Sequence, residues 1–472
     1  MDISYETARR AKVALLGHTV DVQARQYQQL PAYLEALVQS NPGVHYRLLV
    51  DERNHRFRRV FICPKETADC FKFLRGLVAT DGAHLKGVFV QTLLVAVGID
   101  ANNHIVPLAW AVVESETESS WRWFLRELAT AIPNLNTETT TLISDRDKGL
   151  QSADNELQHV GRAYCVQHIA ANVQTKFGIE PRRMFVNCAY ARTKEAWGSA
   201  MEILKDTRHS AYMYVLGLDP AMWAAPFMTA KTWGHPTSNI VESINSLLLE
   251  ERKASIIDLL NGIWHKFMDL RFARLQDAQQ TMEKFPGQLS TDFALETLKE
   301  SSKFSQHRSV LRQDNLHGSI LSYSNSRYVV DLAERTCTCG RFQVNGIPCG
   351  HAVALIYRLH GQPRDFIPTF FSLVTYHDTY SDNVKAIDAD ISSLLMSEEC
   401  LPPNLNRPRG RPKEKRLRKG ERKRRDTIRR AAAIGGLPDI PDNIRQRCSQ
   451  CSGIGHNRTT CKENPRFAGG GL

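Results

Sequence analysis

The stretch LVATDGAHLKGVFVQTLLVAVGIDANNHIVPLAWAVVE, residues 77–114, decides the fold class of this chain. It holds three apolar or β-branched runs, at 77–81, 88–100 and 104–114, and each run predicts a buried β-strand. The pattern then alternates between a helix at 119–132, a strand at 140–144, a helix near 148–158 and a strand at 162–166. Three consecutive strands followed by alternating helices and strands predict an α/β layer with a mixed sheet.

The remaining segments differ from this layer in pattern and composition. Two strand-like runs at 44–51 and 56–63 predict a hairpin, and the residues from 176 to 235 look helical without strand signals. We predict the following division: N-terminal helices plus the hairpin in 1–75, the α/β layer in 76–175, a helical segment in 176–235, a returning helix with a helical connector in 236–320, a cysteine module in 325–362, a basic disordered linker in 401–446, and a second cysteine cluster in 447–463.

The positive charge of the chain is concentrated in one segment. Residues 407–430 hold 14 Lys and Arg against 3 Asp and Glu, an excess equal to the net charge of +11 for all 472 residues. Such a block predicts an arm that binds polyphosphate, or a nuclear import signal. The apolar runs are too short to span a membrane, and the first residues lack the apolar core of a signal peptide, so we predict an intracellular protein.

Two aspartates follow two of the predicted strands. Asp81 ends the strand at 77–81, and Asp145 follows the strand at 140–144. Strand ends on a rigid sheet are common places for chemistry, and convergent carboxylates bind hard cations such as Mg²⁺. For either aspartate alone, a turn residue or a helix cap is the better interpretation, so the metal site depends on the pair and on a third acid. Asp147, in the turn after Asp145, is expected to cap or solvate the helix.

Glu242 is the candidate for a third carboxylate. It lies in TSNIVESINS at 237–246, where helical spacing puts it on one stripe with Asn239 and Asn245. Such a polar stripe could belong to a metal site, or it could be the solvent-exposed side of the helix. Spacing alone leaves the two interpretations balanced.

The first cysteine module has the ligand set of a structural zinc site. CTCGRFQVNGIPCGH supplies Cys337, Cys339, Cys349 and His351, three thiolates and one imidazole for a closed tetrahedral site. The module resembles the SWIM zinc finger. The apolar residues of the helical run that follows, Val353, Leu355 and Ile356, are expected to anchor it.

The second cluster and the basic linker carry two further motifs. Cys448, Cys451, His456 and Cys461 have the C-x2-C-x4-H-x4-C spacing of a retroviral-type zinc knuckle, which predicts a second structural Zn²⁺ and contacts with single-stranded nucleic acid or protein. The string RPRGRPK at 407–413 resembles an AT-hook, in which Arg409 and Arg411 reach into an A·T-rich minor groove.

Three smaller features have open interpretations. Cys165 and His168 are three residues apart, and two ligands are too few for a zinc site. Chemistry alone favours a buried thiol and a hydrogen-bonded histidine. Trp223 reads as a core residue, with stacking on a displaced base as the alternative. The cysteines without an evident partner are expected to be packed or free thiols: Cys63, Cys70, Cys188 and Cys400.

The motifs, taken in order, resemble those of Mutator-like transposases. The resemblance runs from about residue 1 to 360, includes the tail, and rests on DGAHLKG, the stretch from LLVAVGID to SSWRWFL, LISDRDKGL, CVQH and TSNIVESINS. It implies an RNase H-like catalytic core interrupted by an all-α insertion at 176–235, with zinc-binding modules C-terminal to it. It also implies that Asp81, Asp145 and Glu242 are the metal ligands of an Asp-Asp-Glu triad, with Cys165 and His168 in the surroundings of the active site. Ala83 departs from the family, which often has Thr there.

The expected function is therefore that of a DNA transposase, which cuts DNA and joins the strands with Mg²⁺ or Mn²⁺ at the triad. Expected partners are the transposon ends, target DNA and further copies of the chain, and the expected location is the nucleus. A non-catalytic, domesticated transposase acting as a nuclear DNA-binding regulator is the main alternative, which the retained triad disfavours. A scaffold that binds only RNA or protein is the third.

Overall fold

The computed structural model describes residues 20–146, 150, 156–234, 244, 246–306, 308–321, 326–382, 384–387, 390 and 393–404. Several predictions lie outside these residues, namely the helical pattern before residue 20, most of the helix near 148–158, the basic linker and the second cysteine cluster. No helix among the described residues is both long enough and apolar enough to cross a membrane.

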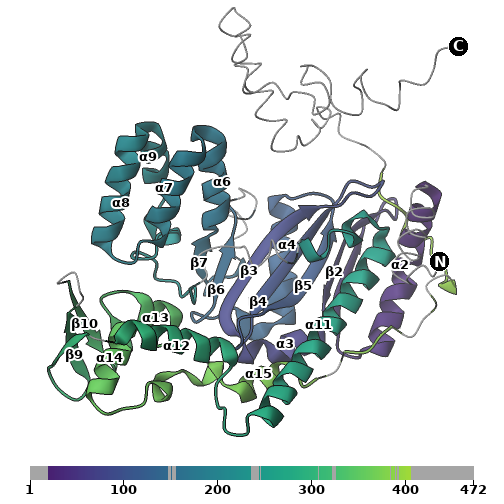
Figure 1. Cartoon of the computed structure of the whole chain (residues 1–472). Helices are drawn as coiled ribbons and strands as arrows, with labels where there is room; N and C mark the ends of the chain where they lie inside the picture. Colours follow the sequence, from purple (N-terminus) through teal and green to yellow (C-terminus); the bar gives the residue numbers. More distant parts are fainter. Residues whose placement is uncertain are drawn as a thin grey trace, which may run out of the picture. The chain divides into compact units, whose positions relative to one another are not determined.

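A mixed sheet forms the centre of the described structure (Figure 1). Its strands, among the residues that the structure describes, are β1 (His45–Val50), β2 (Phe57–Cys63), β3 (Arg75–His84), β4 (Thr92–Ile99), β5 (Ile105–Val113), β6 (Thr141–Ser144) and β7 (Gly161–Tyr164), in the order β1-β2-β5-β4-β3-β6-β7. Neighbours from β1 to β3 pair antiparallel, whereas β3–β6 and β6–β7 pair parallel. The predicted mixed α/β layer and the predicted pairing of the two N-terminal strands are confirmed.

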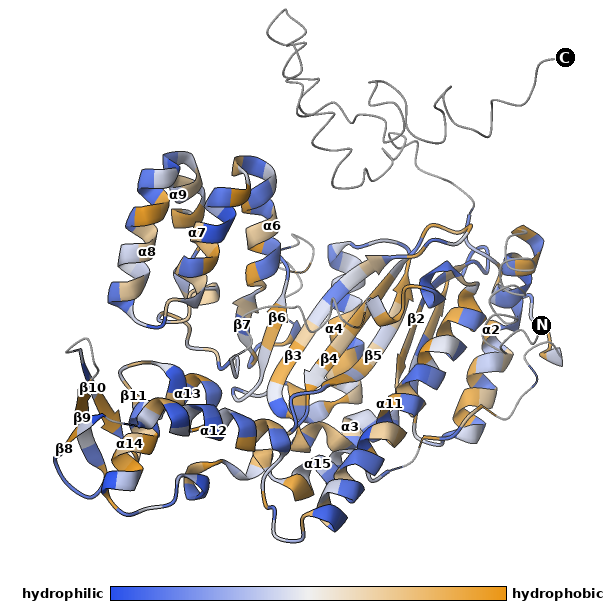
Figure 2. Ribbon diagram, viewed as in Figure 1, coloured by the Kyte–Doolittle hydropathy of each residue, from blue (hydrophilic) through white to orange (hydrophobic). Residues whose placement is uncertain are grey.

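Helices cover both faces of this sheet because its central strands are apolar on both sides. β4 is buried at every position, and the alternating side chains of β3 to β5 pack into two separate cores. One core contains α2 (Val20–Ser40) and α11 (Ile256–Lys284), and the other contains α4 (Glu118–Ala131) and α15 (Leu373–Tyr380). Figure 2 shows the hydrophobic strands between helices that alternate between polar and apolar residues.

Four helices follow β7 in direct succession: α6 (Val166–Phe177), α7 (Ile179–Tyr190), α8 (Lys194–Thr207) and α9 (His209–Leu216). They enclose a core of their own, in which Trp223 is fully buried and lies 5.1 Å from the ring of Phe185. No strand occurs among the described residues between 166 and 234. Trp223 is thus a core residue in this structure, and its side chain is not available for stacking on a base.

A second, smaller sheet differs from what the sequence predicts. It pairs β8 (Ser309–Arg312), β9 (His317–Leu321), β10 (Arg327–Asp331) and β11 (Thr336–Cys337), and it packs against α14 (Gly350–Arg358). β8 and all of β9 except Leu321 fall within 236–320, where helices alone were predicted. The predicted helical periodicity is also interrupted, since Ala254 and Ser255 are extended before α11 begins.

The small sheet and its helices are joined to the main sheet by packing contacts. α12 (Asp292–Ser305) and α14 share an apolar cluster with Phe371, and Phe371 lies under the guanidinium of Arg75 at the start of β3. Arg75 is only 2% exposed and also donates to the side-chain oxygen of Asn103 at 2.8 Å. A buried cation held between Phe371 and the turn after β4 therefore joins this part of the chain to the main sheet.

Candidate functional site

The register of the central sheet brings the two predicted aspartates to the same edge. β3 and β6 run parallel, with Leu77 opposite Thr141 and Ala79 opposite Ile143. Asp81 follows Ala79 by two residues, and Asp145 follows Ile143 by two residues. The same offset therefore sets Asp81 beside Asp145 where the paired segment ends, about one strand spacing apart.

Both aspartates belong to the same face of the sheet. Ala79 and Ile143 point into the core that contains α2 and α11, and a period of two puts Asp81 and Asp145 on that face as well. Ile244 and Leu248 are buried in the same core. The chain thus returns to this face of the sheet immediately after the segment that holds Glu242, although Glu242 itself lies outside the described residues.

His168 lies within electrostatic reach of both carboxylates. Its pKa is raised to about 9, first by a hydrogen bond with Cys165 and further by the negative charges of Asp81 and Asp145, while burial opposes the rise. Cys165 is fully buried at the start of α6, and His168 is in the first turn of that helix. The pair therefore belongs to the surroundings of the aspartates, and a cation bound there would oppose the effect of the carboxylates on His168.

Glu116 is a further acidic residue at this edge that the sequence reasoning missed. A Cβ placed on Gly82, the residue after Asp81, would lie 2.7 Å from Oε1 of Glu116. The carboxylate of Glu116 thus covers the backbone of β3 on the face opposite to that of Asp81. The signal was the glycine itself, because a glycine inside an apolar strand often marks a close approach by another group.

The four predicted zinc ligands lie together where the second sheet meets α14. The ligand atoms of Cys337, Cys339, Cys349 and His351 all lie within 4.8 Å of one another, and Sγ of Cys337 is 3.6 Å from Nδ1 of His351. Ligands about 2.0–2.3 Å from a tetrahedral zinc are separated by roughly 3.5–3.8 Å, so the cluster fits the ion. Val353, Leu355 and Ile356 are buried as expected, and the ring of Tyr328 stacks on His351 at 4.0 Å.

Two left-handed glycines close the turns of this module. Gly340 has a φ of +77° before the short helix α13 (Arg341–Asn345), and Gly346 has a φ of +74° after it. Residues with a Cβ rarely adopt this conformation, so the glycines allow the two ligand pairs to fold toward each other. The SWIM-type spacing therefore corresponds to a compact, closed site.

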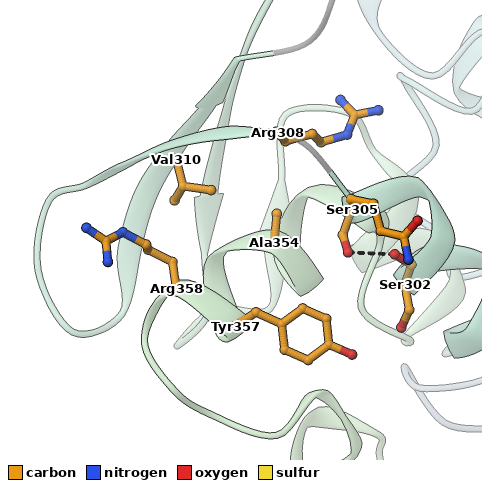
Figure 3. Close-up of a pocket in the computed structure, with 8 residues that line it drawn as sticks. Ser302, Ser305, Arg308, Val310, Ala354, Tyr357 and Arg358 are labelled. Carbon is orange, nitrogen blue, oxygen red and sulfur yellow. Dashed lines mark hydrogen bonds between the residues drawn. The ribbon is translucent and has the colours of Figure 1, made fainter.

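An open surface hollow of about 480 Å³ lies beside the zinc module, between the end of α12 and α14 (Figure 3). Its two serine hydroxyls are already used, because Ser305 donates to the carbonyl of Ser302 at 2.7 Å and Ser302 donates to the carbonyl of Leu298 at 2.9 Å. Arg308 donates through Nε to the carbonyl of Phe304 at 2.6 Å, and Figure 3 shows the guanidinium groups of Arg308 and Arg358 pointing in different directions. The hollow lacks convergent polar groups, so it is a weaker candidate site than the carboxylate edge.

The other predicted ligands and DNA-binding residues lie outside the described residues: Glu242, Cys448, Cys451, His456, Cys461, Arg409 and Arg411. The cysteines without a predicted partner are all buried and form no disulfide: Cys63, Cys70, Cys188 and Cys400. They are packed thiols, as predicted.

Comparison with protein families gives two matches. A model of the MULE transposase domain matches residues 77–172, which include Asp81, Asp145, Cys165 and His168. A model of the SWIM zinc finger matches residues 328–360, which include Cys337, Cys339, Cys349 and His351. No curated protein matches the chain significantly.

The MULE domain implies an RNase H-like fold, a transposase-related function and binding to DNA, and it suggests an enzyme of the nuclease or transposase type. The SWIM match and the cluster of three cysteines and one histidine together support zinc binding. With a MULE transposase domain followed by a SWIM zinc finger, the chain matches a Mutator-like transposase.

Proposed function

We propose that this protein is a DNA transposase that cleaves DNA strands and transfers their ends through an Asp-Asp-Glu triad. The observation that carries the proposal is the parallel register of β3 and β6, which sets Asp81 beside Asp145 on one face of the sheet. This face is also the one to which the chain returns with Ile244 and Leu248, just after Glu242.

The three carboxylates would hold Mg²⁺ or Mn²⁺, since carboxylate oxygens are the ligands these ions prefer. Two such ions, when bound, activate the attacking water or 3′-hydroxyl and stabilise the leaving oxygen in phosphoryl transfer. The rigid sheet fixes the separation of Asp81 and Asp145, and Cys165 orients His168 beside them. These side chains define where the scissile phosphate is held.

Other parts of the chain support the same function in our proposal. Helices α6 to α9 form the all-α insertion that interrupts the catalytic core before the third carboxylate. The basic segment with Arg409 and Arg411, together with the zinc knuckle of Cys448, Cys451, His456 and Cys461, binds DNA or single-stranded nucleic acid. The protein acts in the nucleus as a homo-oligomer, because two transposon ends have to be brought together.

The proposal is tested by incubating the purified full-length protein with supercoiled plasmid DNA that carries the flanking inverted repeats, in Mg²⁺ or Mn²⁺. We expect nicking and strand joining that require the divalent cation. Asp145→Asn removes one negative charge and retains the shape, so it should abolish cleavage while DNA binding persists. Asp147→Asn is the matched control two residues away and should cleave like the wild type.

Two outcomes argue against the proposal. Cleavage that survives in Asp145→Asn would show that the activity comes from another site or from a contaminant. An absence of cleavage together with tight, steeply salt-dependent DNA binding would instead support the non-catalytic DNA-binding regulator.

A further inference from the structure

The loop that follows Asp81 is held in place on both sides. β3 ends at His84, three residues after Asp81, and the amide of Leu85 donates to the carbonyl of Gln91 at 2.9 Å to close the turn. On one side the loop is fixed by α2, where the side chain of Gln23 accepts from the amide of Val88 at 3.0 Å and Tyr27 donates to Gln91 at 2.6 Å. A loop held this way transmits its position to the end of β3.

On the other side the loop is held by Arg252. Its Nε and Nη2 both donate to the carbonyl of His84, at 3.2 and 2.8 Å, and its own carbonyl accepts from the amide of Lys86 at 2.7 Å. The side chain and the main chain of Arg252 therefore bracket the two residues at which β3 ends. Two donors on one acceptor need the planar guanidinium fork, which lysine does not have.

Arg252 is itself held by the core of the protein. The amide of Arg252 donates to Leu248 at 3.0 Å, and the amide of Leu248 donates to Ile244 at 2.9 Å. Ile244 and Leu248 are buried against the sheet, and Glu251, which is 5% exposed, pairs with Lys266 at 2.7 Å. The segment after Glu242 is thus packed against the sheet and joined to the end of β3 by one arginine.

The charge of Arg252 also reaches Asp81. Partial burial lowers the pKa of Arg252, and the carboxylate of Asp81 acts in the opposite direction. The guanidinium is therefore close enough to Asp81 to interact with it through a partly desolvated environment, where such interactions are stronger than in water.

We propose that Arg252 is a positioning residue for the catalytic carboxylates. By donating two hydrogen bonds to the carbonyl of His84, Arg252 fixes the strand end that carries Asp81 to the segment that follows Glu242. This inference rests on the proposed function, because it takes Asp81 and Glu242 to be ligands of one metal site. Arg252 acts through β3 and does not replace any of the three carboxylates.

The test compares Arg252→Gln and Arg252→Lys with Lys253→Gln in the full-length protein. Lys253 is the matched control because it is the next residue, it is exposed, and its ion pair is a local one with Glu250. Three quantities are measured for each variant: the single-turnover cleavage rate at saturating Mg²⁺, the affinity for DNA, and hydrogen exchange at the amides of residues 84–92.

We expect Arg252→Gln to lower the cleavage rate roughly 10- to 100-fold, as the loss of residues that orient metal ligands typically does. DNA affinity should stay within about twofold, and exchange at Lys86 should rise because the strand end is released. Arg252→Lys keeps the charge but not the fork, so its rate should lie between those of the wild type and Arg252→Gln. Lys253→Gln should match the wild type in all three quantities.

The proposal is overturned if Arg252→Gln cleaves at the wild-type rate, or if its rate falls only in proportion to a loss of folded protein with exchange in 84–92 unchanged. If the wild-type protein itself does not cleave DNA, the proposed function fails. In that case the exchange at Lys86 still decides whether Arg252 fastens the end of β3.

Discussion

The zinc cluster and the carboxylate edge differ in how far apart their residues lie in the sequence. The zinc ligands Cys337, Cys339, Cys349 and His351 lie within fifteen residues, and their spacing alone specifies a closed site. Asp81 and Asp145 are 64 residues apart, and only the register of two parallel strands sets them side by side.

This difference determines what each site depends on. The zinc cluster depends on two turns with left-handed glycines and on a small core that the ion helps to hold together. The carboxylate edge depends on the whole sheet, on the loop at 85–91 and on Arg252. We therefore expect changes at the carboxylate edge to affect chemistry before stability, and changes at the zinc cluster to affect stability first.

The largest effect is expected from the carboxylates themselves. Asp81→Asn and Asp145→Asn should each lower the single-turnover cleavage rate by at least about 100-fold, more than the loss of residues that merely orient ligands. If both hold the same ions, the double variant should be little slower than either single variant, because groups that act as a unit are not additive. Thermal unfolding should change little. A double variant that is slower by the product of both effects would show that the two aspartates act independently.

The zinc module offers the contrasting test, with Cys349→Ser compared to Cys188→Ser. Both thiols are buried, but only Cys349 belongs to the ligand cluster. Cys349→Ser should lower the zinc content by one ion per chain and destabilise the module by several kcal/mol, since metal binding and folding are coupled in such sites. Zinc analysis and hydrogen exchange of β9 and β10 measure the two effects. Equal zinc content in both variants would contradict the assignment of the site.

A third test addresses the close approach at Gly82. In Gly82→Ala the new Cβ would lie 2.7 Å from Oε1 of Glu116, the far end of a flexible side chain that can move aside, so the protein should lose less than about 1 kcal/mol of stability, below the usual cost of overpacking. Gly198→Ala is the control, because nothing lies within 4 Å of its Cβ position in α8, and it should gain roughly 0.5–1 kcal/mol.

The cause can be isolated by combining Gly82→Ala with Glu116→Ala. If the clash with Glu116 explains the loss, urea denaturation of the double variant should show a positive coupling between the two changes. Independent effects would mean that Gly82 is needed for another reason.

The comparison also explains what could be predicted from the sequence. The three buried strands at 77–114 and the strand that leads to Asp145 follow from apolar runs, so the mixed sheet and its order of elements were predictable. The zinc ligands were predictable from spacing. β8 was missed because it is short and largely exposed, so that no alternation of apolar residues marks it. β9 is mostly buried, but its five residues HGSIL contain only two large apolar side chains, so it shows no strand pattern either.

The contacts that complete the carboxylate edge could not be predicted in the same way. Glu116 reaches Gly82 from a loop after β5, and Arg252 reaches His84 across 168 residues. Neither residue differs in local pattern from an ordinary surface charge, since their partners are a backbone glycine and a carbonyl oxygen. Such contacts arise from packing: a glycine within a strand can signal a close approach, but only the folded chain identifies the residue that makes it.

The smallest effect is expected from His317 on the zinc module. The pKa of His317 is raised, first by its hydrogen bond with Asp314 at 2.8 Å and further by Asp331. A histidine with a raised pKa in the folded state stabilises that state below its unfolded pKa of about 6.5, and this contribution is lost as the pH rises through the folded value. A titration of the His317 ring by NMR should therefore give a midpoint above 6.5, and the module should become slightly less stable between pH 6 and 8.

The direction of this pH dependence distinguishes the effect of His317 from that of the zinc ligands. Protons compete with zinc for cysteine and histidine, so a module held by the ion loses stability as the pH falls, the reverse of the effect of His317. His317→Gln should remove only the weak loss at higher pH, because exposed ion pairs contribute little. If His317→Gln also removed the loss of stability at low pH, the acid sensitivity of the module would come from this surface pair. The zinc ion would then not be what stabilises the module, and the contrast with the carboxylate edge, which depends on the sheet, would no longer hold.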